Sequence, residues 1–334
     1  MKMNFILATL ICSVTLAHAK ETMPVNIDNF VRAETDHYLQ QRADNGFFGH
    51  IKHIREPVSL DKQPVVRVSR DFLLSYAVFD LTTPVTINMP DTKGRFQTLR
   101  AINEDHYIVS NTYDAGEYVF TKENVGSRYL HLAVRTVVDP RDAKDLAAAH
   151  ALQDQVTWKQ DSAGKLELPD WDQTQLNAVR KAILGLGPFT PDSSRMFGAK
   201  NDVDPVRHLI GTAAGWGGGA QSDAYYINVT PKKNDGKTAF ILKVKDVPVD
   251  GFWSITIYNN AGYMQKSASN AVSLNNITGK KDADGTYTIH FGGDEKASNY
   301  LAIYPGWNYT VRLYRARKDV LDGQWRFPAA VSAQ

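Results

Sequence analysis

The chain has 334 residues, and its 38 lysines and arginines nearly balance its 36 aspartates and glutamates, for a formal net charge of +2. Charges of both signs are spread along the chain, so the basic patch that indicates nucleic-acid binding is absent from the sequence. The single cysteine, Cys12, excludes iron–sulfur clusters, thiolate catalysis and cysteine-ligated zinc sites elsewhere in this sequence.

The first residues have the three parts of a secretory signal peptide. Lys2 gives a positive start, residues 5–16 form a short apolar run, and Ala17-His18-Ala19 places small residues at a cleavage site. The apolar run is shorter than the roughly 20 residues that a membrane helix needs. We therefore expect cleavage after residues 1–19. The mature chain would start at Lys20, be periplasmic or secreted, and carry no cysteine and no transmembrane segment.

The first half of the mature chain predicts one helix followed by short strands. Apolar residues at helical spacing indicate a helix over 24–43. Strands are expected at 65–68, 76–81, 84–90, 95–99, 107–109, 117–121 and 129–138. The sequence Asp-Thr-Lys-Gly at 91–94 predicts a hairpin turn. Short strands at this spacing are typical of a β-sandwich or barrel.

Helices are expected in the middle of the chain. An aspartate that can act as N-cap precedes each of them: Asp139, before Pro140, for a helix to Gln153; Asp170, with Gln173 as capping-box partner, for a helix that ends at Gly185; and Asp204, before Pro205, for a helix over 206–214. A pair of strands at 156–158 and 165–168 is expected between the first two helices.

The last third of the chain predicts strands again, at 239–244, 252–258, 286–291 and 309–315, separated by Asp-Gly and Ala-Gly turns. The whole pattern predicts a mainly β, α+β protein. It has two β-sandwich or jelly-roll-like domains, at 20–160 and 220–334, joined by a helical connector at 161–219.

Several longer motifs are similar to those of a bacterial two-domain family. The first half carries Asn-Phe-Val-Arg-Ala-Glu-Thr-Asp at 29–36 and Gly-Arg-Phe at 94–96, and the second carries Val-Pro-Val-Asp-Gly-Phe-Trp-Ser at 247–254 and Gly-Trp-Asn-Tyr at 306–309. On these motifs the chain resembles domain-of-unknown-function families 1254 in its N-terminal half and 1214 in its C-terminal half. The resemblance implies two β-sandwich-like domains with intervening helices, and it implies no particular activity.

The segment 69–75 departs from the pattern of these relatives. They tend to read Asn-Arg-Asp-Thr-Leu-Tyr-Ser, and this chain has Ser-Arg-Asp-Phe-Leu-Leu-Ser. Arg70 and Asp71 are kept, but Phe72 and Leu74 replace two hydroxyl-bearing residues. If the motif is catalytic in the relatives, the resemblance implies altered or lost activity here.

The triplet Asp105-His106-Tyr107 is the first candidate for chemistry. A histidine titrates near neutral pH and can shuttle protons, and a nearby carboxylate can orient it. On a strand, Asp105 and Tyr107 would share one face and His106 would take the other. The alternative is a polar cluster at a strand end that satisfies backbone groups.

Arginines make the second group of candidates. Arg70 stands beside Asp71, and an arginine fork binds carboxylate or phosphate with two hydrogen bonds. The alternative for this pair is a buried structural ion pair. On the strand 309–315, Arg312 and Tyr314 share one face and could line a cleft for an anionic or sugar-like ligand, or simply be exposed. Arg95 on its own strand is similar.

No metal or cofactor is predicted. His50, His53 and Glu56 have the spacing of one helical turn, but Gly49 and Pro57 favour a loop there, and a zinc site needs firm ligands with supporting hydrogen bonds. The glycine-rich run at 215–219 is not followed by the Lys-Ser/Thr of a phosphate-binding loop.

Two functions remain open from the sequence. The first is an exported hydrolase or lyase with a polar site between the domains, because domain junctions often hold ligand pockets. The second is a non-catalytic periplasmic or envelope-associated protein that binds a small-molecule or cell-envelope ligand there, without nucleic acid. The candidate acid–base residues are Asp105, His106 and Asp71, and the candidate ligand-binding residues are Arg70, Arg95, Tyr107, Arg312 and Tyr314. The sequence gives no oligomeric state.

Overall fold

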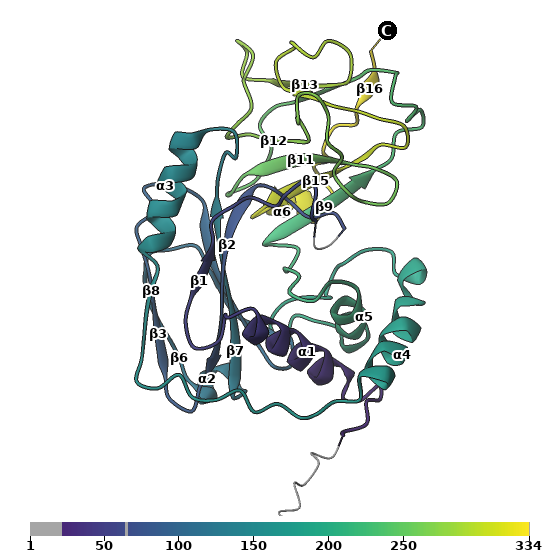
Figure 1. Cartoon of the computed structure of the whole chain (residues 1–334). Helices are drawn as coiled ribbons and strands as arrows, with labels where there is room; N and C mark the ends of the chain where they lie inside the picture. Colours follow the sequence, from purple (N-terminus) through teal and green to yellow (C-terminus); the bar gives the residue numbers. More distant parts are fainter. Residues whose placement is uncertain (1–21, 64–65, 334) are drawn as a thin grey trace, which may run out of the picture.

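The computed structural model describes residues 22–63 and 66–333 (Figure 1). The signal peptide expected at 1–19, including Cys12, lies outside these residues. Within them the fold is α+β, with antiparallel sheets in two regions and helices between them, which confirms the predicted fold class. Figure 1 shows the C-terminal sheets stacked above the N-terminal ones, with α1, α4 and α5 beside the latter.

The N-terminal region contains a five-stranded sheet in the order β1-β2-β7-β4-β5 and a three-stranded sheet in the order β6-β3-β8. The strands of the first sheet are β1 (Lys52–Ile54), β2 (Phe72–Asp80), β7 (Tyr129–Val137), β4 (Gln97–Asn103) and β5 (Ile108–Thr112). Those of the second are β6 (Gly116–Phe120), β3 (Val85–Met89) and β8 (Thr157–Gln160).

Alternation along β3 explains why these two sheets pack face to face. Val85, Ile87 and Met89 are buried, while Asn88 between them is exposed. The buried side chains meet Phe79 and other apolar residues of the five-stranded sheet in one core. This core is the apolar side of the N-terminal domain, so the opposite face of the larger sheet is left for helices and for the second domain.

Helices α1 (Phe30–Asp44), α4 (Gln173–Leu184) and α5 (Pro205–Gly215) lie on that opposite face and share a small core of their own. Leu39 of α1 reaches the sheet at Val78 and Tyr129. An ion pair between Arg180 of α4 and the buried Glu34 of α1 joins the helices. The remaining helices are α2 (Lys122–Val125), α3 (Ala143–Asp154), the short 3-10 helix η1 (Gly187–Phe189) and α6 (Lys318–Leu321).

The C-terminal region is a sandwich of two four-stranded sheets, ordered β14-β13-β10-β16 and β12-β11-β15-β9. Their strands are β9 (Ala224–Val229), β10 (Phe240–Val244), β11 (Trp253–Tyr258), β12 (Ser273–Asn275), β13 (Tyr287–Phe291), β14 (Tyr300–Leu301), β15 (Asn308–Tyr314) and β16 (Val331–Ser332). Val311 and Leu313 of β15 face the core between the sheets. Arg312 and Tyr314 take the other face, as predicted, and that face is turned toward the N-terminal domain.

Several local predictions are wrong, and side-chain hydrogen bonds explain two of them. Helix α3 begins after Asp142 and α4 after Asp172, because these aspartates accept the first free backbone N–H groups of each helix, from Lys144 and Gln175. Asp139 instead accepts the backbone N–H of Arg141. The third predicted start is confirmed, since Asp204 caps α5 by accepting from Val206 and Arg207.

Two of the predicted strands and the predicted hairpin are also absent. Residues 66–68 and 165–168 form no strand, and the backbone of Lys165 is bonded to the side chains of Asp80 and Tyr129 instead of a neighbouring strand. The turn at 91–94 joins β3 to β4, which belong to different sheets. It therefore carries the chain across the edge of the N-terminal domain and forms no hairpin.

None of the helices in the described ranges has the length and hydropathy that crossing a membrane requires.

Candidate functional site

The triplet Asp105-His106-Tyr107 forms the turn between β4 and β5. His106 has a positive φ of 62°, which ends the strand alternation. Oδ1 of Asn103 closes the turn by accepting the backbone N–H of Asp105 at 3.1 Å and that of Tyr107 at 3.0 Å. The predicted division of these side chains between two strand faces is therefore wrong.

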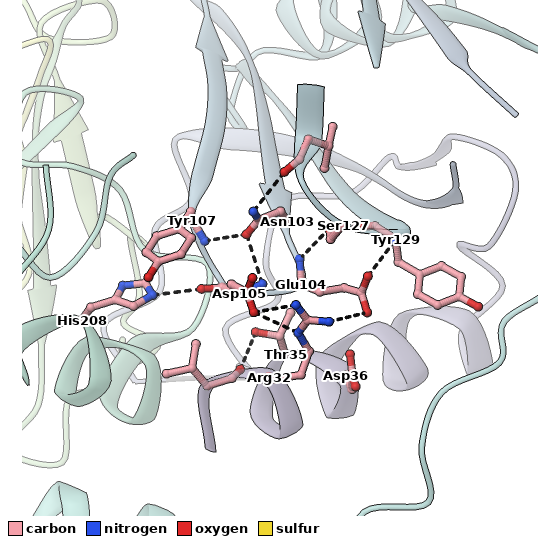
Figure 2. Close-up of polar contacts among 12 residues, drawn as sticks. Arg32, Thr35, Asp36, Asn103, Glu104, Asp105, Tyr107, Ser127, Tyr129 and His208 are labelled. Carbon is pink, nitrogen blue, oxygen red and sulfur yellow. Dashed lines mark hydrogen bonds and ion pairs between the residues drawn. The ribbon is translucent and has the colours of Figure 1, made fainter. Parts of the chain in front are cut away.

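The Asp105 carboxylate is tied to helix α1 (Figure 2). Arg32 donates to Oδ1 of Asp105 from Nε at 3.0 Å and from Nη2 at 2.6 Å, and its Nη1 donates to Glu104 Oε1 at 3.3 Å. The second oxygen of Glu104 accepts the backbone N–H of Tyr129 at 2.9 Å. These contacts join the turn to α1 and to the five-stranded sheet. The triplet therefore belongs to a polar cluster at a strand end that satisfies backbone groups, the alternative to a catalytic role.

His106 has both ring nitrogens engaged inside the protein. Thr212 donates its hydroxyl to the His208 carbonyl, so the Thr212 oxygen accepts from Nδ1 of His106 at 2.8 Å. Nε2 of His106 accepts the backbone N–H of Gly217 at 2.8 Å. Burial, with His208 nearby, lowers the pKa of His106 well below its usual value. The ring is therefore neutral and has no free nitrogen to take a substrate's proton.

Tyr107 stacks on the ring of His208, with centroids 4.7 Å apart. Both nitrogens of His208 lie near carbonyl oxygens: Nδ1 is 2.9 Å from that of Met196, and Nε2 is 3.0 Å from that of Asp105. Tyr107 and the turn are thus packed against α5, away from the domain junction.

Asp71 and Arg312 lie at the domain junction, in contact with groups from both domains. Oδ2 of Asp71 accepts the hydroxyl of Ser254 at 2.8 Å. Arg312, which is 3% exposed, donates from Nη2 to the Arg67 carbonyl and to the Tyr258 hydroxyl, each at 2.6 Å. The segment 67–71 is therefore held on the polar face of β11 and β15, and the arginine is buried there instead of exposed.

Tyr314 and Arg70 belong to the same junction. The Tyr314 ring stacks on Phe252 with centroids 4.3 Å apart and meets Phe72 edge-on at 5.2 Å. Phe72, one of the two departures from the relatives' motif, thus places an apolar ring where the two domains pack. Arg70 is half-buried, its Nε has no partner among the described residues, and burial lowers its pKa.

The predicted site residues therefore do not gather in one place. Asp105, His106 and Tyr107 lie against α1 and α5, while Arg70, Asp71, Arg312 and Tyr314 lie at the domain junction. Across residues 22–63 and 66–333, no hydrogen bond, ion pair or ring contact joins the two groups. Arg95 occupies a third position, at the wall of a cavity between the domains.

A cavity of about 900 Å³ opens between the two domains. Its walls come from the 91–97 segment, helix α3 and the 250–252 and 276–277 segments. Aromatic rings cover part of the wall: Phe96 lies 5.1 Å from Phe252 and 5.5 Å from Tyr113, measured between ring centroids. Of the eight candidate residues, only Arg95 lines this cavity.

Charged side chains of this cavity are mostly paired. Arg95 forms a two-pronged ion pair with Asp145, at 2.6 and 3.0 Å, and also donates to the Val137 carbonyl at 2.8 Å. The hydrogen bonds from Arg95 lower the pKa of Asp145. Lys93 pairs with Asp91 at the exposed edge. These pairs leave Arg95 little freedom to hold a ligand by itself.

Arg315 and Gln97 are the cavity residues that sequence reasoning missed. The Arg315 guanidinium lies over the Tyr113 ring, 4.6 Å from its centroid, and makes no ion pair with a described residue. Gln97 is 2% exposed, and its Nε2 donates to Thr136 at 2.9 Å while its Oε1 has no partner among the residues described. The Gly94-Arg95-Phe96 motif marked this segment, but no local pattern distinguishes Arg315 from other surface arginines.

The described residues contain no group of three histidines, cysteines or acidic residues that could hold a metal ion. His50 and His53, which the sequence spaced like ligands, make separate contacts. Nδ1 of His50 lies 3.0 Å from the Phe48 carbonyl, and Nδ1 of His53 lies 2.7 Å from the Ser75 hydroxyl.

The fold and this cavity define a two-domain α+β protein with a ligand-sized space at the domain junction. Residues 48–160 match the family described as "Protein of unknown function (DUF1254)", and residues 223–318 match "Protein of unknown function (DUF1214)". The chain therefore belongs to the proteins that carry these two domains in its N- and C-terminal halves, which confirms the predicted resemblance. None of the curated proteins matches the sequence.

Two solved structures have a similar fold. The VPA0106 protein from Vibrio parahaemolyticus aligns over 93% of this chain and 100% of its own, with 18% identity and a TM-score of 0.72. An uncharacterised protein from Burkholderia cenocepacia aligns over 92% of this chain and 88% of its own, with 12% identity and a TM-score of 0.51. At these identities the likeness concerns the fold alone.

Proposed function

We propose that this protein is an exported ligand-binding protein that holds a small organic acid with an apolar ring or chain in the cavity between its domains. The observation that carries the proposal is Arg315. Its fork faces the cavity beside an aromatic wall, without an anionic partner among the described residues. An unpaired guanidinium at a partly apolar surface favours a carboxylate, which it can bind with two hydrogen bonds.

The backbone of Arg315 supports this assignment. Its φ of 54° lies in the left-handed region, which is unfavourable for a residue with a side chain. Two backbone hydrogen bonds hold it there: Arg315 donates to the Asp223 carbonyl at 3.0 Å and accepts from Asp250 at 2.9 Å. Such strain is often kept where a side chain has to be aimed at a ligand. Here it accompanies the placement of the guanidinium over Tyr113.

The shape and chemistry of the cavity support the apolar part of the ligand. Phe96, Phe252 and Ile277 line it, and its volume is within the range of small-molecule sites.

Binding is favoured over hydrolysis or a lyase reaction because the cavity lacks the residue types that most often start one. No histidine, serine or cysteine of the described residues lines it. Asp145, its most enclosed carboxylate, has a lowered pKa and is held by Arg95, so it is a weak base. The ring nitrogens of His106 are occupied elsewhere. We therefore place the binding hypothesis ahead of the enzymatic one.

The test uses 4-phenylbutyrate, an acid with one ring and one carboxylate, titrated calorimetrically into the purified protein. We expect saturable binding, and we expect Arg315→Gln to weaken it about tenfold or more through the loss of a charged hydrogen-bond pair. Arg326→Gln is the matched control, because Arg326 is exposed and is not among the residues that line the cavity. Equal affinity in the wild type and the Arg315→Gln variant would reject the proposal.

Export is part of the same proposal and has its own test. N-terminal sequencing of the protein from the periplasmic or culture fraction of a bacterial host should read from Lys20. Recovery of the chain in the cytoplasm with residues 1–19 intact would contradict export, without affecting the binding experiment.

A further inference from the structure

One face of the five-stranded sheet carries two arginines without an acidic partner among the described residues. Leu132 and Val134 of β7 point into the core of the N-terminal domain, so Ala133 and Arg135 lie on the opposite face of the sheet. Tyr76 of β2 stands opposite Ala133 in the antiparallel register. Tyr76 and Arg135 are therefore diagonal neighbours, close enough for long side chains to meet. Helix α1 lies on the same side of the sheet (Figure 1).

Arg42 of α1 brings the second guanidinium to this face. Its Cζ lies over the Tyr76 ring, 4.0 Å from the centroid. His131 is on the same face of β7. Burial lowers the pKa of this histidine well below its usual value, and the charges of Arg42 and Arg135 lower it further. Both guanidiniums therefore act on one side chain of the sheet, so their positive fields overlap there.

The acidic residues of α1 are turned away from Arg42. Asp36 and Asp44 line a second cavity, of about 440 Å³, between α1 and the segment 168–173, and Asp36 is itself only 2% exposed. Glu34 is held by its ion pair with α4. Arg42 lies two positions before Asp44, and residues at that spacing do not face each other on a helix. None of these carboxylates forms an ion pair with Arg42 in the described part of the chain.

Hydrogen-bond donors thus gather around Tyr76 without acceptors. The side chains of Arg42, Arg135 and Tyr76 form no hydrogen bond or ion pair with a described residue, and all three are half-buried. Of their polar atoms only Nε of Arg42 is enclosed by protein, so the other N–H groups and the phenol O–H are open to a ligand. Arg100, on the same face, is in contrast 3.5 Å from the carboxylate of Asp223.

We propose that this face of the sheet binds a dianionic oxyanion, such as a phosphate group, between Arg42 and Arg135, with the Tyr76 hydroxyl as a further donor. An arginine fork binds phosphate oxygens with two hydrogen bonds. A phosphate group carries about two negative charges and three strong acceptor oxygens. Two guanidiniums match that charge, and the three donor groups match those oxygens. The site is independent of the cavity between the domains.

A dianion fits this face better than a carboxylate does. A single negative charge would leave one of the two guanidiniums uncompensated. Positive charge is already costly here, since burial, and after it the charge of Arg135, lowers the pKa of Arg100 to about 10. A ligand with two negative charges removes this repulsion more fully than one with a single charge.

The test titrates inorganic phosphate calorimetrically into the purified full-length protein at pH 8, in about 150 mM NaCl to screen the exposed surface. At this pH phosphate is mainly a dianion, whereas acetate carries one charge. We expect saturable phosphate binding and acetate binding that is at least tenfold weaker. The absence of saturable phosphate binding, or equal affinity for the two anions, would overturn the proposal.

Variants locate the site. Arg42→Gln and Arg135→Gln should each weaken phosphate binding about tenfold or more, because each removes a charged hydrogen-bond donor. Arg326→Gln, which changes an exposed arginine of the C-terminal domain, is the matched control and should bind as the wild type does. Unchanged affinity in a folded Arg42→Gln or Arg135→Gln variant would reject the site.

Two further variants cover the other outcomes. Tyr76→Phe keeps the ring under Arg42 and removes only the hydroxyl, so it should fold and bind phosphate a few-fold more weakly. If neither arginine variant folds, wild-type affinity in Tyr76→Phe rejects the site. Arg315→Gln should bind phosphate as the wild type does. Loss of phosphate binding in that variant would assign the anion to the cavity between the domains, so the two sites are tested separately.

Discussion

The cavity between the domains and the cavity beside α1 differ in how their charges are balanced. Between the domains, carboxylates are paired with arginine or lysine, and the group left over is the cation of Arg315. Beside α1, the group left over is the carboxylate of Asp36. The two cavities thus differ in the sign of the charged group that lacks an opposite partner. Cavity size alone therefore says little about a ligand, whereas a charged group without an opposite partner indicates the sign of the charge that the ligand should carry.

The largest effect on the free energy of unfolding is expected from Asp36→Asn. The folded chain binds a proton at Asp36 up to about pH 7, whereas the unfolded chain releases it near pH 3.8. The free energy of unfolding of the wild type therefore falls as pH rises from about 4 to about 7 and stays lowered above that. The variant lacks this penalty and should be more stable than the wild type by up to about 4 kcal/mol at pH 8.

Urea unfolding at pH 5 and pH 8 checks this prediction. Asp44→Asn is the control, since it removes an exposed carboxylate from the same cavity. If the stability difference between Asp36→Asn and wild type is the same at both pH values, Asp36 is not the buried acid described here.

The next largest effect tests the packing around the other cavity. A Cβ at Gly251 would stand 2.6 Å from the Tyr314 carbonyl oxygen and 2.7 Å from the Phe96 ring. Gly251→Ala should therefore cost about 2 kcal/mol and weaken 4-phenylbutyrate binding. Gly187→Ala, where a Cβ meets nothing within 4 Å, is the matched control. Equal thermal midpoints for the two variants would contradict the close approach of the domains at this wall.

A smaller effect, of opposite pH dependence, is expected from Asp145→Asn. Arg95 lowers the folded pKa of Asp145, so the pair stabilises the protein above the unfolded pKa and the stabilisation is lost as pH falls through the folded one. The side chain is 27% exposed, which limits the loss at pH 7 to about 1 kcal/mol. The deficit of the variant should disappear at pH 2 to 3, as measured by urea unfolding; a deficit that persists there would exclude the ion pair as its cause.

The smallest effect on stability is expected from Arg315→Gln. The guanidinium contacts the Tyr113 ring and makes no ion pair with a described residue, so its loss should change the free energy of unfolding by about 0.5 kcal/mol. The same change should remove most of the acid affinity. A large loss of stability would instead assign Arg315 to the fold.

Much of the fold could be predicted because periodicity survives in each strand and each helix. β10, β11, β13 and β15 follow their predicted ranges closely, and Asp204 caps α5 as expected. The errors lie where side chains replace backbone partners, as at residues 165–168. They also lie where a turn joins two sheets, as at 91–94. Neither event leaves a local signature, because the deciding partners are distant in the chain.

The candidate sites were harder to predict for a related reason. His106 has the residue type of a catalytic base, yet its hydrogen bonds to Thr212 and Gly217, more than 100 positions later, make it structural. Asp36 is the reverse case. It falls three and six residues after Ala33 and Phe30, among the buried residues of α1, and a carboxylate at such a position is a signal that the sequence did contain.

The buried Arg312 bears on how a ligand would enter. Because its fork donates to the Arg67 carbonyl across the junction, separating the domains would break this hydrogen bond and expose the packed rings of Phe72, Phe252 and Tyr314. The two domains should therefore keep their relative position when a ligand binds, without a hinge motion that closes over the ligand. An acid ligand would enter and leave through an opening that is always present. Its association and dissociation rates would then depend on ionic strength more than on mutations between the domains.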